Sequence, residues 1–289
     1  MRFCLCFIAQ TGIINSIFFY YGRVYPPVAF CPPLLFILPY ISYKSQIGKA
    51  WVFLPCPKGT AFMSNLRVRM FVYVVRFVCM MISVPLHESA HALAASRLGD
   101  DTARRQGRLS LNPLAHFSPL GAVCFLLLGV GWATPVPVDA RNFRRVSPRA
   151  GMALTAAAGP ITNLLLAFLA VVGYKLLYYI GPVNPLTNLL LYILNALAVM
   201  NLALAALNLL PVPPLDGSRL LGLALPRRVQ YFIAQHEQQI FFVAIALLFL
   251  GLLDGPMAWI QSQLWRFLGW STSFVEILLG LGRAAGTAV

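Results

Sequence analysis

Residues 68–95 read VRMFVYVVRFVCMMISVPLHESAHALAA. The stretch is apolar over most of its length, and it is longer than the about 20 residues that a helix needs to cross a membrane. Its end is rich in serine and alanine, small residues that let neighbouring helices approach closely. We therefore predict a transmembrane helix that packs against other helices.

The whole chain has the composition of a membrane protein. Of its 289 residues, 59% are hydrophobic and only 10% are charged, whereas soluble domains average about 45–50% and about 25%. This excludes a soluble globular enzyme and a disordered chain. The formal net charge is +14, but no soluble domain carries it. We therefore expect the positive charge to face the cytoplasm and the lipid headgroups, with no nucleic-acid partner.

Further apolar stretches complete a predicted bundle. Residues 151–179, 186–210 and 240–260 are each long enough to span a membrane. Residues 120–134 are shorter and glycine-containing, which favours a re-entrant or interfacial element. Residues 265–282 fit a weak span or an amphipathic surface helix equally well. The predicted fold class is an all-α polytopic membrane protein, a helical bundle of about four to six transmembrane helices with a re-entrant or interfacial element.

Basic residues indicate the orientation of this bundle. If residues 120–134 enter and return on one side, all the arginines in the short loops share that side, and the opposite loop, residues 181–185, has no charge. The positive-inside rule then makes the arginine side cytoplasmic. The arginines concerned are Arg104, Arg105, Arg108, Arg141, Arg144, Arg145, Arg149, Arg219, Arg227 and Arg228.

The motif with the clearest chemistry is His87-Glu88-Ser89-Ala90-His91, an HExxH pattern inside a predicted membrane helix. Residues four apart share a helical face, so both imidazoles can reach one metal ion, and imidazole is a good zinc ligand. Glu88 is turned by about 100° from His87 and can act as general base on the water of the metal. Ionisable residues at membrane depth are costly, which favours a functional site.

Two histidines leave zinc short of ligands, so a third is expected elsewhere. Asp216 is the best candidate, at the end of the stretch NLLPVPPLDG that starts at Asn208. The prolines prevent helical geometry, which predicts a kinked loop at the membrane edge. Asn208 has two possible roles there: capping free carbonyls of the loop or hydrogen bonding the backbone of a substrate.

Two further polar residues are candidates for support. His116 precedes the re-entrant element. It either supports the metal ligands or the substrate, or it is a solvated histidine at the membrane interface. Asn163 follows Gly159-Pro160 in a predicted span, and we expect this group to kink the helix and to allow close packing.

Taken together, the motifs resemble the site-2 protease family of zinc intramembrane metalloproteases, in its compact bacterial type without a PDZ domain. They are HExxH, Asn112-Pro-x-x-His116, Gly-Trp-Ala-x-Pro-Val-Pro-Val at residues 131–138, Ala-Gly-Pro-x-x-Asn163 and Asn208-Leu-Leu-Pro-x-Pro-Pro-Leu-Asp216-Gly. The resemblance covers about residues 68–260. Members of this type often have Asp two residues after the loop histidine, where this chain has Ser118.

The resemblance implies one zinc ion per chain, bound by His87, His91 and Asp216, with Glu88 as catalytic base. It also implies a membrane-anchored protein substrate, cut within or beside its transmembrane helix. We expect an integral, multi-pass protein of the bacterial inner membrane with its active site near the cytoplasmic side. The alternative functions are a membrane metal transporter and a catalytically silent membrane scaffold.

The predicted organisation has three parts. Residues 63–262 form the metalloprotease core, and residues 263–289 form an amphipathic or membrane-associated tail. Residues 1–62 are an N-terminal extension with two interpretations: loose membrane spans, or sequence upstream of a translation start at Met63.

Overall fold

The computed structural model describes residues 4–6, 40–44, 51–55, 60–116 and 131–280 of the chain. The helices and strands among them are β1 (Cys4–Cys6), β2 (Tyr40–Lys44), β3 (Trp51–Pro55), α2 (Thr60–Leu98), α3 (Thr102–Arg105), η2 (Pro113–Ala115), β4 (Gly131–Ala133), η3 (Ala140–Asn142), α5 (Pro148–Ile180), α6 (Pro185–Leu209), α7 (Asp216–Leu221), α8 (Arg227–Gln235), α9 (Glu237–Phe249), α10 (Asp254–Ser271) and α11 (Phe274–Leu278).

The chain divides into two compact units, and the division falls within α2. One unit is residues 12–75, and the other combines residues 1–11 with residues 76–289. The smaller unit contains the antiparallel pair β2–β3, in which Tyr40 lies opposite Pro55 and Lys44 opposite Trp51. The larger unit contains every candidate site residue.

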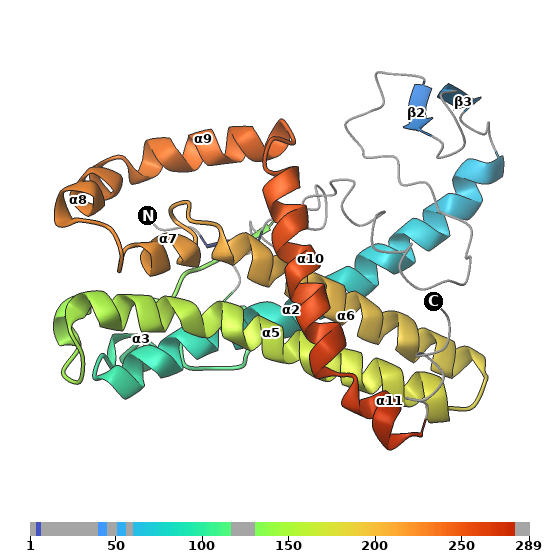
Figure 1. Cartoon of the computed structure of the whole chain (residues 1–289), viewed down its shortest axis with the longest axis horizontal. Coiled ribbons are helices and arrows are strands. Elements are labelled where there is room, and N and C mark those ends of the chain that lie inside the picture. The colour runs from blue at the N-terminus through green and yellow to red at the C-terminus, as the bar shows by residue number, and fades with distance from the viewer. Residues whose placement is uncertain (1–3, 7–39, 45–50, 56–59, 117–130, 281–289) are drawn as a thin grey trace. The chain divides into compact units, whose positions relative to one another are not determined.

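Three helices of the described chain are long and apolar enough to cross a membrane. They are residues 70–98 of α2, all of α5 and all of α6 (Figure 1). The predicted spans at 68–95, 151–179 and 186–210 coincide with these helices. The fold class predicted from the sequence, a helical membrane protein, is thereby confirmed.

Local sequence signals explain where α5 and α6 begin. Ser147 precedes Pro148 at the start of α5, and its side chain accepts a hydrogen bond from the Ala150 backbone. Asn184 precedes Pro185 in the same way, and its side chain accepts from Thr187 N at 2.7 Å. A polar cap followed by proline is a strong helix start, because the cap satisfies a free N–H and proline needs none.

The core of the bundle lies where three helices meet. α5 and α6 run side by side, and α10 packs on both (Figure 1). Ala167 of α5, Leu202 of α6 and Leu268 of α10 are almost fully buried and form one apolar cluster. α11 packs against α5, where Lys175 Nζ and Glu276 Oε1 form an ion pair of 2.8 Å.

The predicted span at residues 240–260 is wrong, because the chain breaks there into two helices. α9 ends at Phe249 and α10 begins at Asp254. Gly251 has φ of +71°, and Leu252 N donates to Leu247 O at 3.0 Å. These features form a Schellman motif, in which glycine adopts the left-handed conformation that closes a helix. The stretch is apolar as predicted, but its glycine ends the helix too early for a continuous span.

Most of the predicted re-entrant element lies outside the described residues, since residues 117–130 are not described. Ser118 is among them. The two positions that flank this stretch are joined directly, because Thr134 N donates to His116 O at 2.7 Å. The strand β4 then pairs antiparallel with β1, with Leu5 opposite Trp132.

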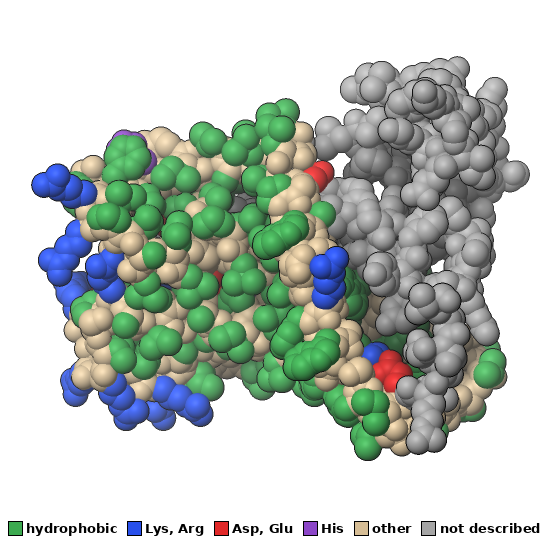
Figure 2. Space-filling view, viewed as in Figure 1, with side chains coloured by type: hydrophobic (Ala, Val, Ile, Leu, Met, Phe, Trp, Pro, Cys, Tyr) green, Lys and Arg blue, Asp and Glu red, His purple; other side chains and the backbone are tan. Residues whose placement is uncertain are grey.

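Three loops that carry arginines meet at one end of the larger unit. The backbone N–H groups of Arg144 and Arg145 donate to Leu98 O, at the end of α2. Arg149 Nη2 donates to Gly222 O at 2.9 Å and to Leu225 O at 2.6 Å, between α7 and α8. On the face shown in Figure 2, most lysine and arginine side chains gather at one end. This grouping agrees with the prediction that these loops share one side.

Candidate metal centre

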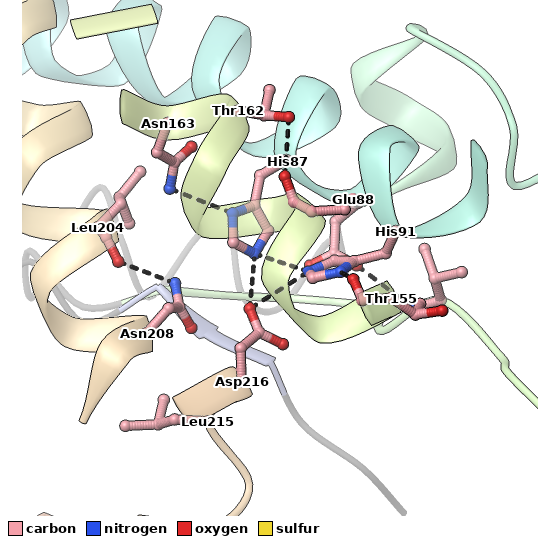
Figure 3. A network of polar contacts seen from close by, with 12 residues as sticks. His87, Glu88, His91, Thr155, Thr162, Asn163, Leu204, Asn208, Leu215 and Asp216 are labelled. Atoms are coloured by element: carbon pink, nitrogen blue, oxygen red, sulfur yellow. Dashed lines mark hydrogen bonds and ion pairs between the residues drawn. The ribbon is translucent and has the colours of Figure 1, made fainter. Parts of the chain in front are cut away.

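Three side chains with metal-ligating atoms converge at one buried point. His87 and His91 lie one turn apart on α2, and Asp216 is the first residue of α7. The two histidine Nε2 atoms are 3.0 Å apart, and Asp216 Oδ2 lies 3.4 Å from His87 Nε2 and 3.3 Å from His91 Nε2 (Figure 3). The structure therefore brings both histidines of the motif to the predicted third ligand.

The hydrogen bonding of this cluster fits a bound cation. Nδ1 of His91 lies 2.7 Å from the carbonyl oxygen of Thr155. A carbonyl can only accept, so Nδ1 carries the proton and Nε2 of the neutral ring presents a lone pair. That lone pair faces Asp216 Oδ2, which has no hydrogen-bond donor among the described residues. Two imidazole nitrogens and one carboxylate oxygen are a usual ligand set for a catalytic zinc with an open position.

One face of α5 forms the wall behind the two histidines (Figure 3). Thr155, Gly159 and Asn163 follow each other at intervals of four, so they lie one above the other. Asn163 Nδ2 lies 3.1 Å from His87 Nδ1. A Cβ added to Gly159 would lie only 2.4 Å from His87 Cε1 and 2.4 Å from His91 Nε2. Glycine at this position lets the backbone of α5 touch the imidazoles.

The position of Asp216 depends on close packing between α6 and α7. The prolines that follow α6 end the helix, and α7 starts again at Asp216. A Cβ added to Gly217 would lie 2.4 Å from the carbonyl oxygens of both Leu209 and Leu210. α7 also packs on α5. The small residue after Asp216 thus allows α7 to fold back onto the end of α6 and to present the carboxylate to the histidines.

Glu88 lies beside this cluster without belonging to it. Its side chain is only 2% exposed, and Oε2 accepts a hydrogen bond from Val136 N at 3.3 Å. The other oxygen, Oε1, has no hydrogen-bond partner in the described part of the chain. One oxygen is therefore held by the backbone while the other is available to a water molecule or a proton.

A buried carboxylate outside the membrane-spanning segment holds the extended segment that carries Val136. Asp100 Oδ1 accepts from Thr102 N and Asn142 Nδ2, both at 3.0 Å, and Oδ2 accepts from Asp139 N at 2.7 Å. Burial acts to raise the pKa of Asp100, but the hydrogen bonds from Thr102, Asn142 and Asp139 outweigh it and leave the pKa below its ordinary value. Asp100 thus links the end of α2 to the segment beside Glu88.

Two other predicted site residues lie in less direct positions. Asn208 is buried, and its amide nitrogen donates to Leu204 O, one turn earlier in its own helix, rather than to a loop carbonyl. His116 is fully buried, so the alternative of a solvated histidine is wrong. Its Nε2 lies 2.6 Å from Ser110 O, which makes it a support of the loop before the undescribed stretch.

Several contributing residues are not among the sequence predictions. Thr155 acts through its carbonyl and Val136 through its N–H, and backbone groups leave no side-chain signature. Asp100 follows a membrane helix and resembles an ordinary loop acid. The one sequence signal for these residues is the spacing of Thr155, Gly159 and Asn163 at intervals of four, which places them on one face of a helix. That face becomes informative once it is known to lie against the two histidines.

Comparisons with known proteins agree with this geometry. The model of "Peptidase family M50" matches residues 178–252, a stretch that includes Asn208 and Asp216. The chain is 39% identical over 175 residues to "Putative zinc metalloprotease YwhC" of Bacillus subtilis, covering 59% of this chain and 78% of the relative. The chain belongs to peptidase family M50.

Two further relatives are less similar to this chain. The chain is 30% identical over 192 residues to "Putative zinc metalloprotease Rip2" of Mycobacterium tuberculosis, with 65% of this chain and 70% of the relative covered. It is 28% identical over 182 residues to the protein of the same name from Mycolicibacterium smegmatis, with 61% and 67% covered. No solved structure matches the chain.

Membership of family M50 confirms the resemblance to site-2 proteases and the prediction of a peptidase-class enzyme. It disfavours the alternative of a metal transporter, since the matched family and the matched relatives are peptidases by description. The roles of individual site residues stay predictions at this point.

Proposed function

We propose that this M50 protein is a zinc-dependent intramembrane endopeptidase that hydrolyses peptide bonds in or beside the transmembrane segments of membrane-anchored proteins. The observation that carries the proposal is the buried cluster of His87, His91 and Asp216, with Glu88 adjacent on the same membrane helix. One span, α2, supplies three of these residues, and α7, the short helix after the span α6, supplies Asp216. This supports a site built into the membrane domain.

In this proposal, the three clustered residues hold one zinc ion through two Nε2 atoms and one carboxylate oxygen. When bound, zinc supplies a Lewis acid that makes a water molecule acidic near neutral pH and polarises the carbonyl to be attacked. The donor set supports zinc because it combines imidazole and carboxylate in a site with one position left for water. The names of the matched relatives support the same metal.

Glu88 is the proposed general base. Val136 N–H holds Oε2, which leaves Oε1 to accept a proton from water and to return it to the leaving amine. Amide hydrolysis needs a general base, and few other residues near this site can take the proton. Asn208, buried at the end of α6, is a candidate to hydrogen bond the substrate backbone.

The substrate must expose its backbone before it can be cut, because a helix hides its carbonyls in its own hydrogen bonds. The segment beside Glu88 supports a way to receive an unwound chain. β4 lies directly before it in sequence and forms an antiparallel ladder with β1. Backbone that pairs in this way can add an extended peptide as a further strand.

The arrangement of loops supports a site near the cytoplasmic side of a bacterial inner membrane. Arg144 and Arg145 donate to Leu98 at the end of α2, and Arg149 donates to Gly222, the residue after α7. The hydrogen bond between His116 and Thr134 supports the interpretation that the stretch between them enters and leaves on one side. Residues 63–262 remain our assignment for the catalytic core, with 1–62 as an extension and 263–289 as a tail.

The proposed function is tested by comparing membrane fragments from cells that carry wild type or Glu88→Gln. Glutamine keeps the shape and an oxygen for Val136 N–H, but it cannot accept a proton at neutral pH. We expect fragments with new ends in or next to transmembrane segments in wild type and their loss in Glu88→Gln. A general base contributes about 10²–10⁴-fold to rate.

The matched control is Glu237→Gln, since Glu237 starts α9 and takes no part in the cluster. It should leave the fragment pattern unchanged. Zinc content of purified Glu88→Gln should equal that of wild type, because Glu88 is not a proposed ligand. An unchanged fragment pattern in Glu88→Gln would refute the base and with it the proposed peptidase.

A further inference from the structure

Asn163 is a buried residue of α5 whose side-chain nitrogen has a hydrogen-bond partner and whose side-chain oxygen has none among the described residues. Its nitrogen Nδ2 is 3.1 Å from His87 Nδ1, and both residues are buried. Its oxygen Oδ1 is buried with no hydrogen-bond partner among the described residues. An unsatisfied buried carbonyl is costly. Figure 3 shows the amide pointing from α5 directly at the outer edge of the His87 ring.

The geometry at His91 shows what the second histidine requires. Thr155 O fixes the proton of His91 on Nδ1, so that its Nε2 is free toward Asp216. His87 also turns Nε2 toward Asp216. For that nitrogen to present a lone pair, the proton of His87 must lie on Nδ1, and Nδ1–H then needs an acceptor.

The side chain of Asn163 contains that acceptor. Amide oxygen and nitrogen have nearly the same shape, and their assignment follows from the hydrogen bonds they make. With the two atoms exchanged, Asn163 Oδ1 accepts from His87 Nδ1–H, and the amide nitrogen takes the buried position that the oxygen leaves. The exchange moves no heavy atom of the backbone. With the His87 proton on Nδ1, it replaces two N–H groups that face each other by a hydrogen bond from Nδ1–H to the amide oxygen.

We propose that Asn163 is a positioning residue that holds His87 in the Nδ1–H tautomer and so presents its Nε2 to the metal. Thr155 O does the same for His91, and the two contacts come from one face of α5, eight residues apart. Gly159 lies between them and lets this face approach the rings. α5 therefore prepares both imidazoles of α2 before any metal binds.

This inference rests on the proposed zinc site but not on catalysis, so it is tested by metal binding. Partners of this kind typically contribute 10–100-fold to metal affinity. We expect Asn163→Leu to weaken zinc binding 10–100-fold in a competition titration with a chelator. We expect Asn163→Asp to stay within a few-fold of wild type, because a carboxylate is also an acceptor for Nδ1–H.

The matched control is Asn201→Leu. Asn201 is a fully buried amide on α6 whose nitrogen donates to Ser83 Oγ at 2.9 Å, not to a histidine. It should lower thermal stability without changing zinc affinity. Asp216→Ala should abolish tight binding and serves as the reference for a lost ligand.

Two readouts separate positioning from general packing. The visible absorption of Co²⁺ bound in place of zinc should change in Asn163→Leu and match wild type in Asn163→Asp. In ¹⁵N-histidine spectra of the wild-type protein, His87 should be protonated on Nδ1, a result that holds whether or not Asn163→Leu folds.

Zinc affinity equal to wild type in Asn163→Leu, an equal loss in Asn163→Asp, or a His87 protonated on Nε2 would each overturn the proposal. A protein that binds zinc as expected yet cuts no membrane protein would refute the proposed function and leave this inference standing.

Discussion

At the residue scale, the candidate metal centre depends on glycine at position 159 as well as on the three clustered side chains. Gly159 places the backbone of α5 against both imidazoles, and an added Cβ would come within 2.4 Å of each. The atoms it would meet are ring atoms of buried side chains held by Asn163 and Thr155. Neither ring can move away without losing a hydrogen bond on its far edge.

We therefore expect Gly159→Ala to reduce zinc binding by at least tenfold, since displacing a ring also removes its support from α5. Zinc content after dialysis and a chelator titration measure the effect. Gly173→Ala on the same helix is the control, because its Cβ would meet only Leu194 methyl groups at 3.6 Å. If Gly159→Ala retains wild-type affinity, α5 does not constrain the rings as described.

At the scale of elements, Asp100 joins the end of α2 to the segment that approaches Glu88. Four donors converge on its carboxylate: the backbone N–H and the hydroxyl of Thr102, Asn142 Nδ2 and Asp139 N. The hydrogen-bonded network fixes the start of η3 and, through residues 134–139, the N–H that holds Glu88 Oε2. Asp100 thus aligns α2 and the segment that holds Glu88 from outside the membrane-spanning part of α2.

Stability should depend on this carboxylate in acid. Because the folded-state pKa of Asp100 is lowered, its stabilisation is complete above the ordinary value of about 3.9 and is lost as pH falls through the lower folded value. Asp100→Asn turns one acceptor into a donor that faces other donors, at a cost of about 1–3 kcal/mol. We expect a lower melting temperature than wild type at pH 7 and a shrinking difference below about pH 4.

Thermal unfolding of both proteins in detergent across this pH range measures the effect. The control is Asp101→Asn, an exposed neighbour whose side chain accepts a hydrogen bond from Ser96 Oγ. Asparagine keeps this acceptor, so the variant should melt like wild type. A constant difference between Asp100→Asn and wild type from pH 7 to pH 3 would contradict the ionised role of Asp100.

At the scale of the whole molecule, the distribution of charge determines orientation. Loops far apart in sequence meet through Leu98, Gly222 and Leu225, and arginines gather around them (Figure 2). The opposite turn between α5 and α6 is uncharged and exposes Val183 almost completely. By the positive-inside rule, we therefore expect the arginine side to face the cytoplasm.

Single cysteines at Arg105, Arg144 and Arg227, in a background without other cysteines, should all be protected from a membrane-impermeant maleimide in intact cells. Val183→Cys should react with it, which makes the turn at Val183 the internal control. Labelling of Arg144→Cys from outside would mean that the stretch before it crosses the membrane.

The sequence by itself predicted three spans, the HExxH pair and the family, and it named Asp216, which the structure places beside the two histidines. These depend on local properties: apolar length, helical spacing of four residues, and an acid placed after helix-ending prolines. The same reasoning failed at residues 240–260, where overall apolarity concealed the helix-closing glycine at position 251. Local sequence signals are reliable where the spacing of residues close together in the chain decides the structure.

Only the tertiary structure decided how the ligands are supported. Asn163 and Thr155 reach histidines 76 and 64 residues away in sequence, and Val136 reaches Glu88 across 48 residues. Such contacts follow from how helices pack, and two of the three partner atoms belong to the backbone, which is the same for nearly every residue type. A pattern of side chains can therefore name the ligands of a metal, but the groups that orient them become visible only when α5 lies against α2.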